Sequence, residues 1–121
     1  LVRYISMVVK DYGHRNSKVY IEPKASGQSV FQMLKKLGLN VREVKMLEGD
    51  KITRANSVEP FLWGGKVKVL KGGWNDSFIE PLMSFPRGKH DEPVDCLIMA
   101  LNEAFNSGQR KIQARRIRLL G

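Results

Sequence analysis

Three acidic side chains, Asp91, Glu92 and Asp95, lie within five positions of one another, just ahead of an apolar run. On a helix, residues three and four apart share a face within about 6 Å. Like charges at that distance repel unless a cation compensates them. Carboxylate oxygens are also the ligands that Mg²⁺ prefers. The spacing therefore predicts a divalent-metal site at the start of a helix.

The same acids have a purely structural interpretation. Pro93 is tolerated only in the first turn of a helix, which places Asp91 or Glu92 near the N-cap. Aspartate is a favoured N-cap residue, and carboxylates suit the positive end of the helix dipole. One cap needs only one acid, so the residues alone leave both the cap and the metal site open.

Glu22 is a fourth candidate ligand. It follows the apolar run Val19–Ile21, which predicts a strand buried on both faces, and Pro23 ends that strand. Open α/β sheets place ligands at the carboxyl ends of strands, although a solvated glutamate is the alternative. We expect the carboxylates of Glu22 and Asp95 to face one another across a solvent-open cleft, with the other helix-start acids at its rim. Such a cluster suits two metal ions that catalyse phosphoryl transfer.

The elements that must position these acids alternate between helices and strands. Apolar spacing predicts helices over 2–12, 26–37, 50–60, 75–83 and 94–105. Strands are predicted at 19–21, 39–44 and 66–69, the last from its strict alternation. Asp50 is expected to cap its helix and Pro60 to bend or end it. The order implies a single α/β domain with a sheet that is at least partly parallel.

The composition restricts the class of protein. The 121 residues suffice for one domain, and 42% hydrophobic residues are typical of a soluble globular protein. No apolar stretch could span a bilayer, and no signal-peptide pattern opens the chain. One cysteine and two histidines exclude a disulfide framework and are too few for a structural zinc site. The net charge of +9, with a basic tail over 109–121, predicts a nucleic-acid partner, although a basic surface without a partner is the alternative.

Three blocks of the sequence resemble a known family. In this order, "VYIEPKASGQSVFQMLKK", "GDKITRANSVEPFLWGGKVKV" and "FPRGKHDEPVDCLIMAL" look like the C-terminal nuclease domain of the large terminase subunit of tailed bacteriophages. The resemblance runs roughly from Val19 to Leu101. It implies an RNase H-like, three-layer α/β fold with a mixed sheet flanked by helices. It also implies an endonuclease that cuts concatemeric double-stranded DNA during genome packaging in the bacterial host cytoplasm.

The resemblance also implies roles for the acids. Glu22 matches the family's strand-end metal ligand. His90-Asp91-Glu92-Pro93-Val94-Asp95 matches its helix-start pattern, which is commonly His-Asp-Asp-x-x-Asp. Glu92 stands where the second aspartate usually lies, so the division of labour among the three helix-start acids stays open. Glu22, Asp91, Glu92 and Asp95 are thus the implied catalytic ligands of two Mg²⁺ or Mn²⁺ ions in a complete domain.

Three basic residues, Lys24, Lys51 and Arg54, fall in the family's polar loops and are candidate phosphate contacts; ordinary surface charges are the alternative. DNA binding through them should be weak, insensitive to sequence and strongly salt-dependent. The further partners that the resemblance implies are the packaging ATPase domain of the same full-length protein, the small terminase subunit and the portal. No membrane partner is implied.

One departure from the family concerns its first catalytic aspartate, which lies on the first strand of the sheet. No strand is predicted before Val2, and Asp11 lies in a helix. The resemblance therefore implies an N-terminally truncated domain, and we expect this chain alone to be a poor nuclease. No phosphate-loop motif is present, so the packaging ATPase is expected elsewhere or is absent. A related RNase H-like resolvase or transposase, and a non-catalytic DNA-binding prophage remnant, are the alternatives.

Overall fold

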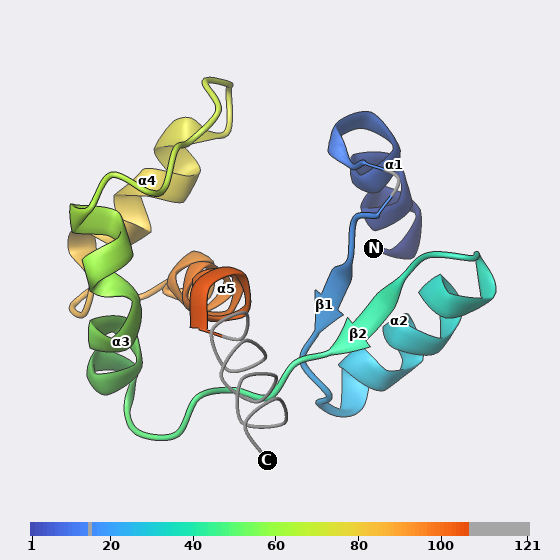
Figure 1. Cartoon of the computed structure of the whole chain (residues 1–121), viewed down its shortest axis with the longest axis horizontal. Coiled ribbons are helices and arrows are strands. Elements are labelled where there is room, and N and C mark those ends of the chain that lie inside the picture. The colour runs from blue at the N-terminus through green and yellow to red at the C-terminus, as the bar shows by residue number, and fades with distance from the viewer. Residues whose placement is uncertain (15, 107–121) are drawn as a thin grey trace, which may run out of the picture. The chain divides into compact units, whose positions relative to one another are not determined.

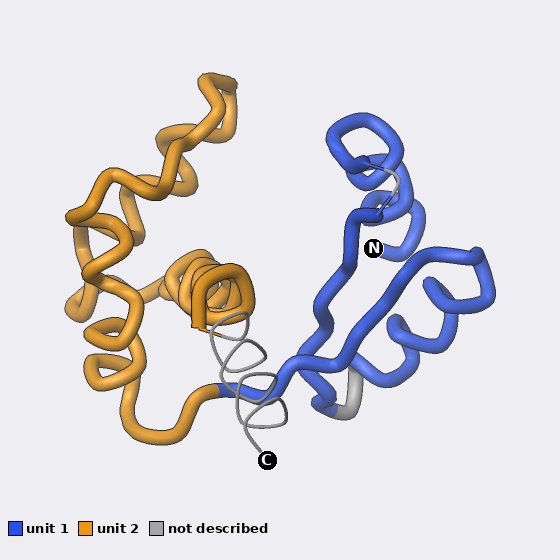
Figure 2. The backbone as a smooth tube through the Cα atoms, in the orientation of Figure 1, with its two compact units in different colours: residues 1–46 blue, residues 47–121 orange. Residues whose placement is uncertain are grey.

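The computed structural model describes residues 1–14 and 16–106 (Figure 1). Contacts between residues divide the chain into two compact units, Leu1–Met46 and Leu47–Gly121 (Figure 2). The single domain expected from the chain length stays a prediction, and the basic tail over 109–121 lies outside the described residues. Among the residues that are described, no helix is both long enough and apolar enough to cross a membrane.

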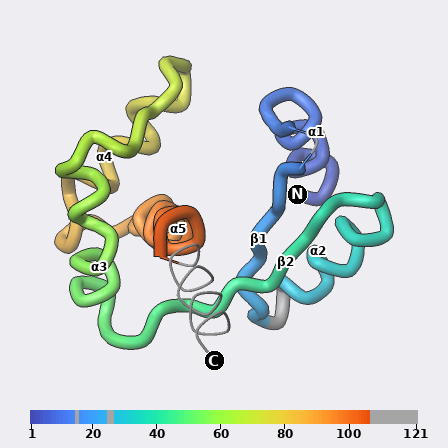
Figure 3. The backbone as a smooth tube through the Cα atoms, in the orientation of Figure 1, coloured from blue at the N-terminus to red at the C-terminus, as the bar shows by residue number. Residues whose placement is uncertain are grey.

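The first unit contains a strand–helix–strand arrangement. β1 (Val19–Ile21) and β2 (Val41–Glu43) form a two-stranded parallel sheet in which Val19 pairs with Val41. Parallel strands need a crossover, and α2 (Ala25–Lys36) supplies it while packing on β2 (Figure 3). Leu34, Val41 and Val44 are the buried hydrophobic residues of this unit. The parallel sheet expected from the sequence is confirmed.

In the first unit, the end of the first helix agrees with the sequence prediction and the burial of β1 does not. α1 (Val2–Tyr12) ends at Gly13, as its apolar spacing predicted, and it contacts α2. Burial along β1 alternates, because successive side chains of a strand point to opposite faces, and Tyr20 is 39% exposed. The prediction that this strand is buried on both faces is therefore wrong.

The second unit is helical in the residues described. α3 (Lys51–Trp63), α4 (Asn75–Ser84) and α5 (Glu92–Leu101) are followed by a short π-helical turn, η1 (Asn102–Asn106). Both α3 and α4 contact α5. The core consists of Val58, Val94, Ile98 and Leu101. The rings of Phe61 and Phe105 stack with centroids 4.5 Å apart beside it. Of the apolar stripe predicted for the last helix, Val94, Ile98 and Leu101 are confirmed as core, whereas Ala104 is exposed.

Pro60 and the segment 66–69 depart from the predictions. Pro60 does not end the helix: α3 continues to Trp63, and the Pro60 carbonyl still accepts a hydrogen bond from the Gly64 N–H at 2.9 Å. A bend at Pro60 stays a prediction. Proline lacks an N–H and its ring crowds the preceding turn, but its carbonyl can still accept a hydrogen bond from the following turn. Residues 66–69 form no strand. Their alternation reflects Val67 packing against the helical core, without a partner strand among the described residues.

Candidate metal and nucleic-acid site

The start of α3 is fixed by Asp50. Its carboxylate accepts a hydrogen bond from the Thr53 N–H at 2.8 Å, which is the N-cap interaction that the sequence predicted. This bond satisfies one of the unpaired N–H groups at the helix start, and it lowers the pKa of Asp50. The cap sets the first turn of α3, and that turn presents Lys51 and Arg54.

Lys51 joins the start of α3 to the start of α5. Its ammonium donates a hydrogen bond to Asp91 Oδ2, across 40 residues of sequence, and lies 4.0 Å from Asp95 Oδ2. Asp91 does occupy the N-cap position of α5, but its side chain makes no capping hydrogen bond. The interpretation of the Asp91 side chain as a cap is therefore wrong, because its carboxylate pairs with the ammonium of Lys51.

The pair is charged at neutral pH. The hydrogen bond from Lys51 lowers the pKa of Asp91, and desolvation opposes it only in part. The same hydrogen bond raises the pKa of Lys51, with the charges of Asp91 and Asp95 adding to it. Each partner thus favours the ionised form of the other.

Asp95 and Arg54 each retain unused hydrogen-bonding capacity. Asp95 Oδ1 is buried and has no hydrogen-bond partner, and the same holds for Arg54 Nε. Arg54 is half-buried one turn along α3 from Lys51. Buried polar atoms are normally hydrogen-bonded, so each of these two atoms needs an explanation, and a bound ion or water is a common one. For the carboxylate oxygen of Asp95, a bound cation would supply the missing partner.

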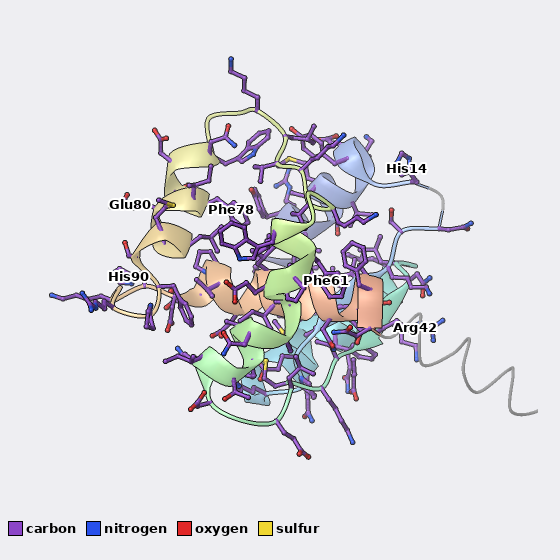
Figure 4. All side chains as sticks on the ribbon, turned by 60° about the vertical axis from the view of Figure 1, so that its left-hand side comes forward. His14, Arg42, Phe61, Phe78, Glu80 and His90 are labelled. Carbon is purple, nitrogen blue, oxygen red and sulfur yellow. The ribbon has the colours of Figure 1, made fainter. Side chains whose placement is uncertain are left out.

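Glu92 and His90 stand apart from this contact. Glu92 is exposed in the first turn of α5 and forms no ion pair with any residue that the structure describes. His90 is exposed in the segment before α5 (Figure 4). The structure therefore brings together Asp91 and Asp95, and the role of Glu92 as a ligand stays a prediction.

Glu22 lies directly after β1 in the first unit and pairs with Lys24 at 3.1 Å. The Glu22 side chain is 25% exposed, whereas that of Lys24 is 76% exposed. Because Glu22 and the helix-start acids belong to different units, their convergence across a cleft stays a prediction. Two of the three predicted phosphate contacts, Lys24 and Lys51, are thus paired with predicted metal ligands.

The acids at the start of α5 provide few ligands for a divalent ion. In residues 1–14 and 16–106, no group of three or more His, Cys, Asp or Glu side chains is arranged to hold a metal. Two carboxylates nevertheless converge on one cation, and Asp95 has a further oxygen without a partner. Mg²⁺ keeps several waters and is commonly bound through one or two carboxylates. Asp91 and Asp95 therefore fit a largely hydrated divalent ion.

Sequence reasoning missed the contact between Lys51 and the acids. It placed Lys51 among the phosphate contacts because of its polar loop. A signal was present, since Lys51 follows a capping aspartate and so opens a helix. A cation in the first turn of a helix is disfavoured by the dipole, unless a carboxylate compensates it.

Comparison with known proteins gives one match. No curated protein and no solved structure matches the chain significantly. Residues 5–104 match the terminase RNaseH-like domain family, so the match spans both units and all seven candidate residues. It confirms the RNase H-like α/β fold that the resemblance implied, and it indicates a terminase nuclease role in phage DNA packaging. The chain belongs to the terminase RNaseH-like domain family.

Proposed function

We propose that this protein is a metal-dependent endonuclease module that cuts concatemeric double-stranded DNA during phage genome packaging. One observation supports it beyond family membership. Asp91 and Asp95 converge on the ammonium of Lys51, and Asp95 Oδ1 is buried without a hydrogen-bond partner. Two carboxylates that converge on one cation at the start of a helix are suited to hold a divalent cation at that place.

In this proposal the acids bind metal ions and the basic residues bind DNA phosphates. Asp91 and Asp95 would hold a divalent ion, Mg²⁺ or Mn²⁺, with Glu22 and Glu92 as the further ligands of a two-ion centre. Such ions activate the attacking water and stabilise the leaving oxygen of a phosphodiester. Lys24 and Arg54 would contact phosphates, which suits the net charge of +9.

The proposal extends to partners. Double-stranded DNA is the substrate, and the packaging ATPase domain of the full-length protein is the neighbour. The small terminase subunit, the portal and the host cytoplasm belong to the same proposal. The two alternatives are weaker. In a remnant the acids would be only caps and surface charges, but Asp91 makes no capping hydrogen bond and shares the Lys51 ammonium with Asp95. A resolvase or transposase need not share the block containing Lys51, which the family match spans.

The test combines Mn²⁺ binding, measured by calorimetry, with cleavage of supercoiled plasmid. Asp95→Ala should weaken Mn²⁺ binding roughly tenfold or more, because one of a few carboxylate ligands is lost. It should also abolish the slow cleavage expected of this chain. Asp76→Ala is the matched control. Asp76 also lies in the first turn of a helix, four residues before Glu80 (Figure 4), and it is exposed.

The outcomes separate clearly. Unchanged Mn²⁺ binding and cleavage in Asp76→Ala, with loss of both in Asp95→Ala, would support the metal site at α5. Equal binding by wild-type, Asp76→Ala and Asp95→Ala proteins would show that α5 holds no metal, and the proposed function would then lose its structural basis.

A further inference from the structure

We infer that Lys51 is a built-in competitor of the metal ion: its ammonium holds Asp91 and Asp95 together in the metal-free protein and must be displaced, or be repelled, when a divalent ion binds. The inference rests on the proposed function, because it concerns the same two carboxylates. It assigns Lys51 a role other than the DNA contact that its loop suggested.

The contacts place the ammonium where a metal ion would be. Lys51 Nζ donates to Asp91 Oδ2 and lies 4.0 Å from Asp95 Oδ2, so one monovalent cation is shared by two carboxylates. A divalent ion bound by the same two oxygens would lie within a few ångströms of that ammonium. Both cations cannot occupy the space between the two carboxylates, so binding of one disfavours the other.

The position of Lys51 in its helix supports a specific pairing over a chance one. It is the first residue of α3, where the helix dipole presents its positive end. A lysine there is unfavourable by itself and gains from an acidic partner. The backbone beneath it is fixed by the Asp50 cap, which limits where the side chain can reach.

Asp95 offers more to a divalent metal ion than to the Lys51 ammonium. Its Oδ2 faces the ammonium at the outer limit of an ion pair, and its Oδ1 is buried without a partner. Lys51 therefore leaves part of the ligating capacity of Asp95 unused. A divalent ion with open coordination positions could use it, so exchange of ammonium for metal would gain a ligand as well as charge.

The experiment measures Mn²⁺ affinity by calorimetry, without DNA, for the wild type and three variants that each replace one lysine. They are the wild type, Lys51→Met, Lys51→Arg and Lys66→Met. Lys51→Met keeps the length of the side chain and removes its charge. It should raise Mn²⁺ affinity roughly tenfold, from Coulomb's law for a unit charge and a divalent ion about 5 Å apart in water.

The other two variants are controls. Lys51→Arg keeps the charge and should bind Mn²⁺ within about twofold of wild type, since the repulsion is retained. Lys66→Met removes an exposed lysine from the segment after α3 and reports the effect of net charge alone. Circular dichroism of each variant shows whether the helices are retained.

Tighter Mn²⁺ binding in Lys51→Met, and not in Lys66→Met, would support competition. Weaker or unchanged binding in Lys51→Met, while Asp95→Ala still loses binding, would overturn the inference and leave the proposed function standing. It would mean that Lys51 orders the carboxylates without competing. No Mn²⁺ binding by either wild type or Lys51→Met would refute both.

Discussion

The two units each place a predicted metal ligand beside a lysine at the start of a helix, but they do so in different ways. In the first unit, Glu22 pairs with Lys24, which is the N-cap residue of α2. In the second, Asp91 pairs with Lys51, which is the first residue of α3. The first pair spans two residues of sequence, whereas the second spans 40 and connects two helices.

The exposure of the two lysines shows what this difference means. The Lys24 side chain is 76% exposed, and such surface pairs are weak because solvent screens them. The Lys51 side chain is 45% exposed and serves two carboxylates, and its pKa is raised by the hydrogen bond to Asp91. Lys24 is thus a solvated charge that balances Glu22, while Lys51 holds the carboxylates of Asp91 and Asp95 near one another.

The backbone at each helix start is also fixed by a different device. α2 has no side-chain cap, and its first turn approaches the end of β1 so closely that only a glycine fits at position 27. α3 has the Asp50 cap. Close backbone packing against the Glu22 carbonyl therefore marks the start of α2, and a side-chain hydrogen bond fixes the start of α3.

The largest expected effect comes from Gly27→Ala. A Cβ at this position would collide with the Glu22 carbonyl oxygen, which is backbone and cannot turn aside, and would press on Ile21. Alanine usually favours a helix by about 0.5–1 kcal/mol over glycine, but overpacking costs about 1–3 kcal/mol. We expect a net loss of about 1–2 kcal/mol in the free energy of unfolding, measured by urea denaturation.

Gly73→Ala is the matched control for this substitution, since a Cβ at Gly73 meets nothing within 4 Å. Its stability should change by less than about 0.5 kcal/mol. Hydrogen exchange of the α2 amides should accelerate in Gly27→Ala alone. A Gly27→Ala protein that is as stable as wild type would show that contact with Glu22 does not position this helix.

The sequence predicted the elements whose signals are local. Tyr12 precedes a glycine stop, Asp50 precedes its helix with a capping side chain, and the last helix has a continuous apolar stripe; all three are confirmed. The predicted strand at 66–69 is wrong, because alternation only indicates which side chains pack inward. Val67 is partly buried against helices, and Val69 is exposed. Pro60 shows the same limit, since a local rule cannot weigh the packing that holds α3 together beyond it.

The sequence predicted which acids belong to the candidate site, but it did not predict which residues they contact. The spacing of Asp91 and Asp95 indicated two carboxylates that need a cation, and the structure supplies one. Its identity could not be read from the sequence, because Lys51 is 40 residues away and only tertiary packing of α3 on α5 brings it near. Convergence with Glu22 is a still longer-range property and stays a prediction.

The next effect concerns the Asp50 cap. Asp50→Ala should lower the melting temperature by about 3–6 °C near neutral pH, because one N–H at the start of α3 loses its acceptor. The pKa of Asp50 is lowered below its ordinary value of 3.8. A lowered folded pKa stabilises the protein above pH 3.8, and this contribution is lost as the pH falls through the folded value.

Asp50→Asn separates the cap from the charge. Asparagine caps as well as aspartate and does not titrate in this range, so its melting temperature should stay close to that of wild type near neutral pH. The difference between wild type and Asp50→Ala should shrink on acidification, while that between Asp50→Asn and Asp50→Ala should not. A difference between wild type and Asp50→Ala that is constant with pH would contradict the charge assignment.

The smallest effect separates the two lysines as DNA contacts. Binding of short labelled duplexes is measured by fluorescence anisotropy at several salt concentrations, with EDTA present to exclude metal. Each phosphate contact that is lost should lower the slope of log K against log salt by about 1. Lys24→Gln should show that change, because an exposed ammonium in a weak local pair is free to reach a phosphate. Lys51→Gln should change the slope less, since two carboxylates already hold its ammonium.

Lys24→Arg keeps the charge and should leave the slope unchanged. If Lys51→Gln lowers the slope as much as Lys24→Gln does, then Lys51 leaves its carboxylates to bind DNA without any metal, and the contrast between the two lysines fails.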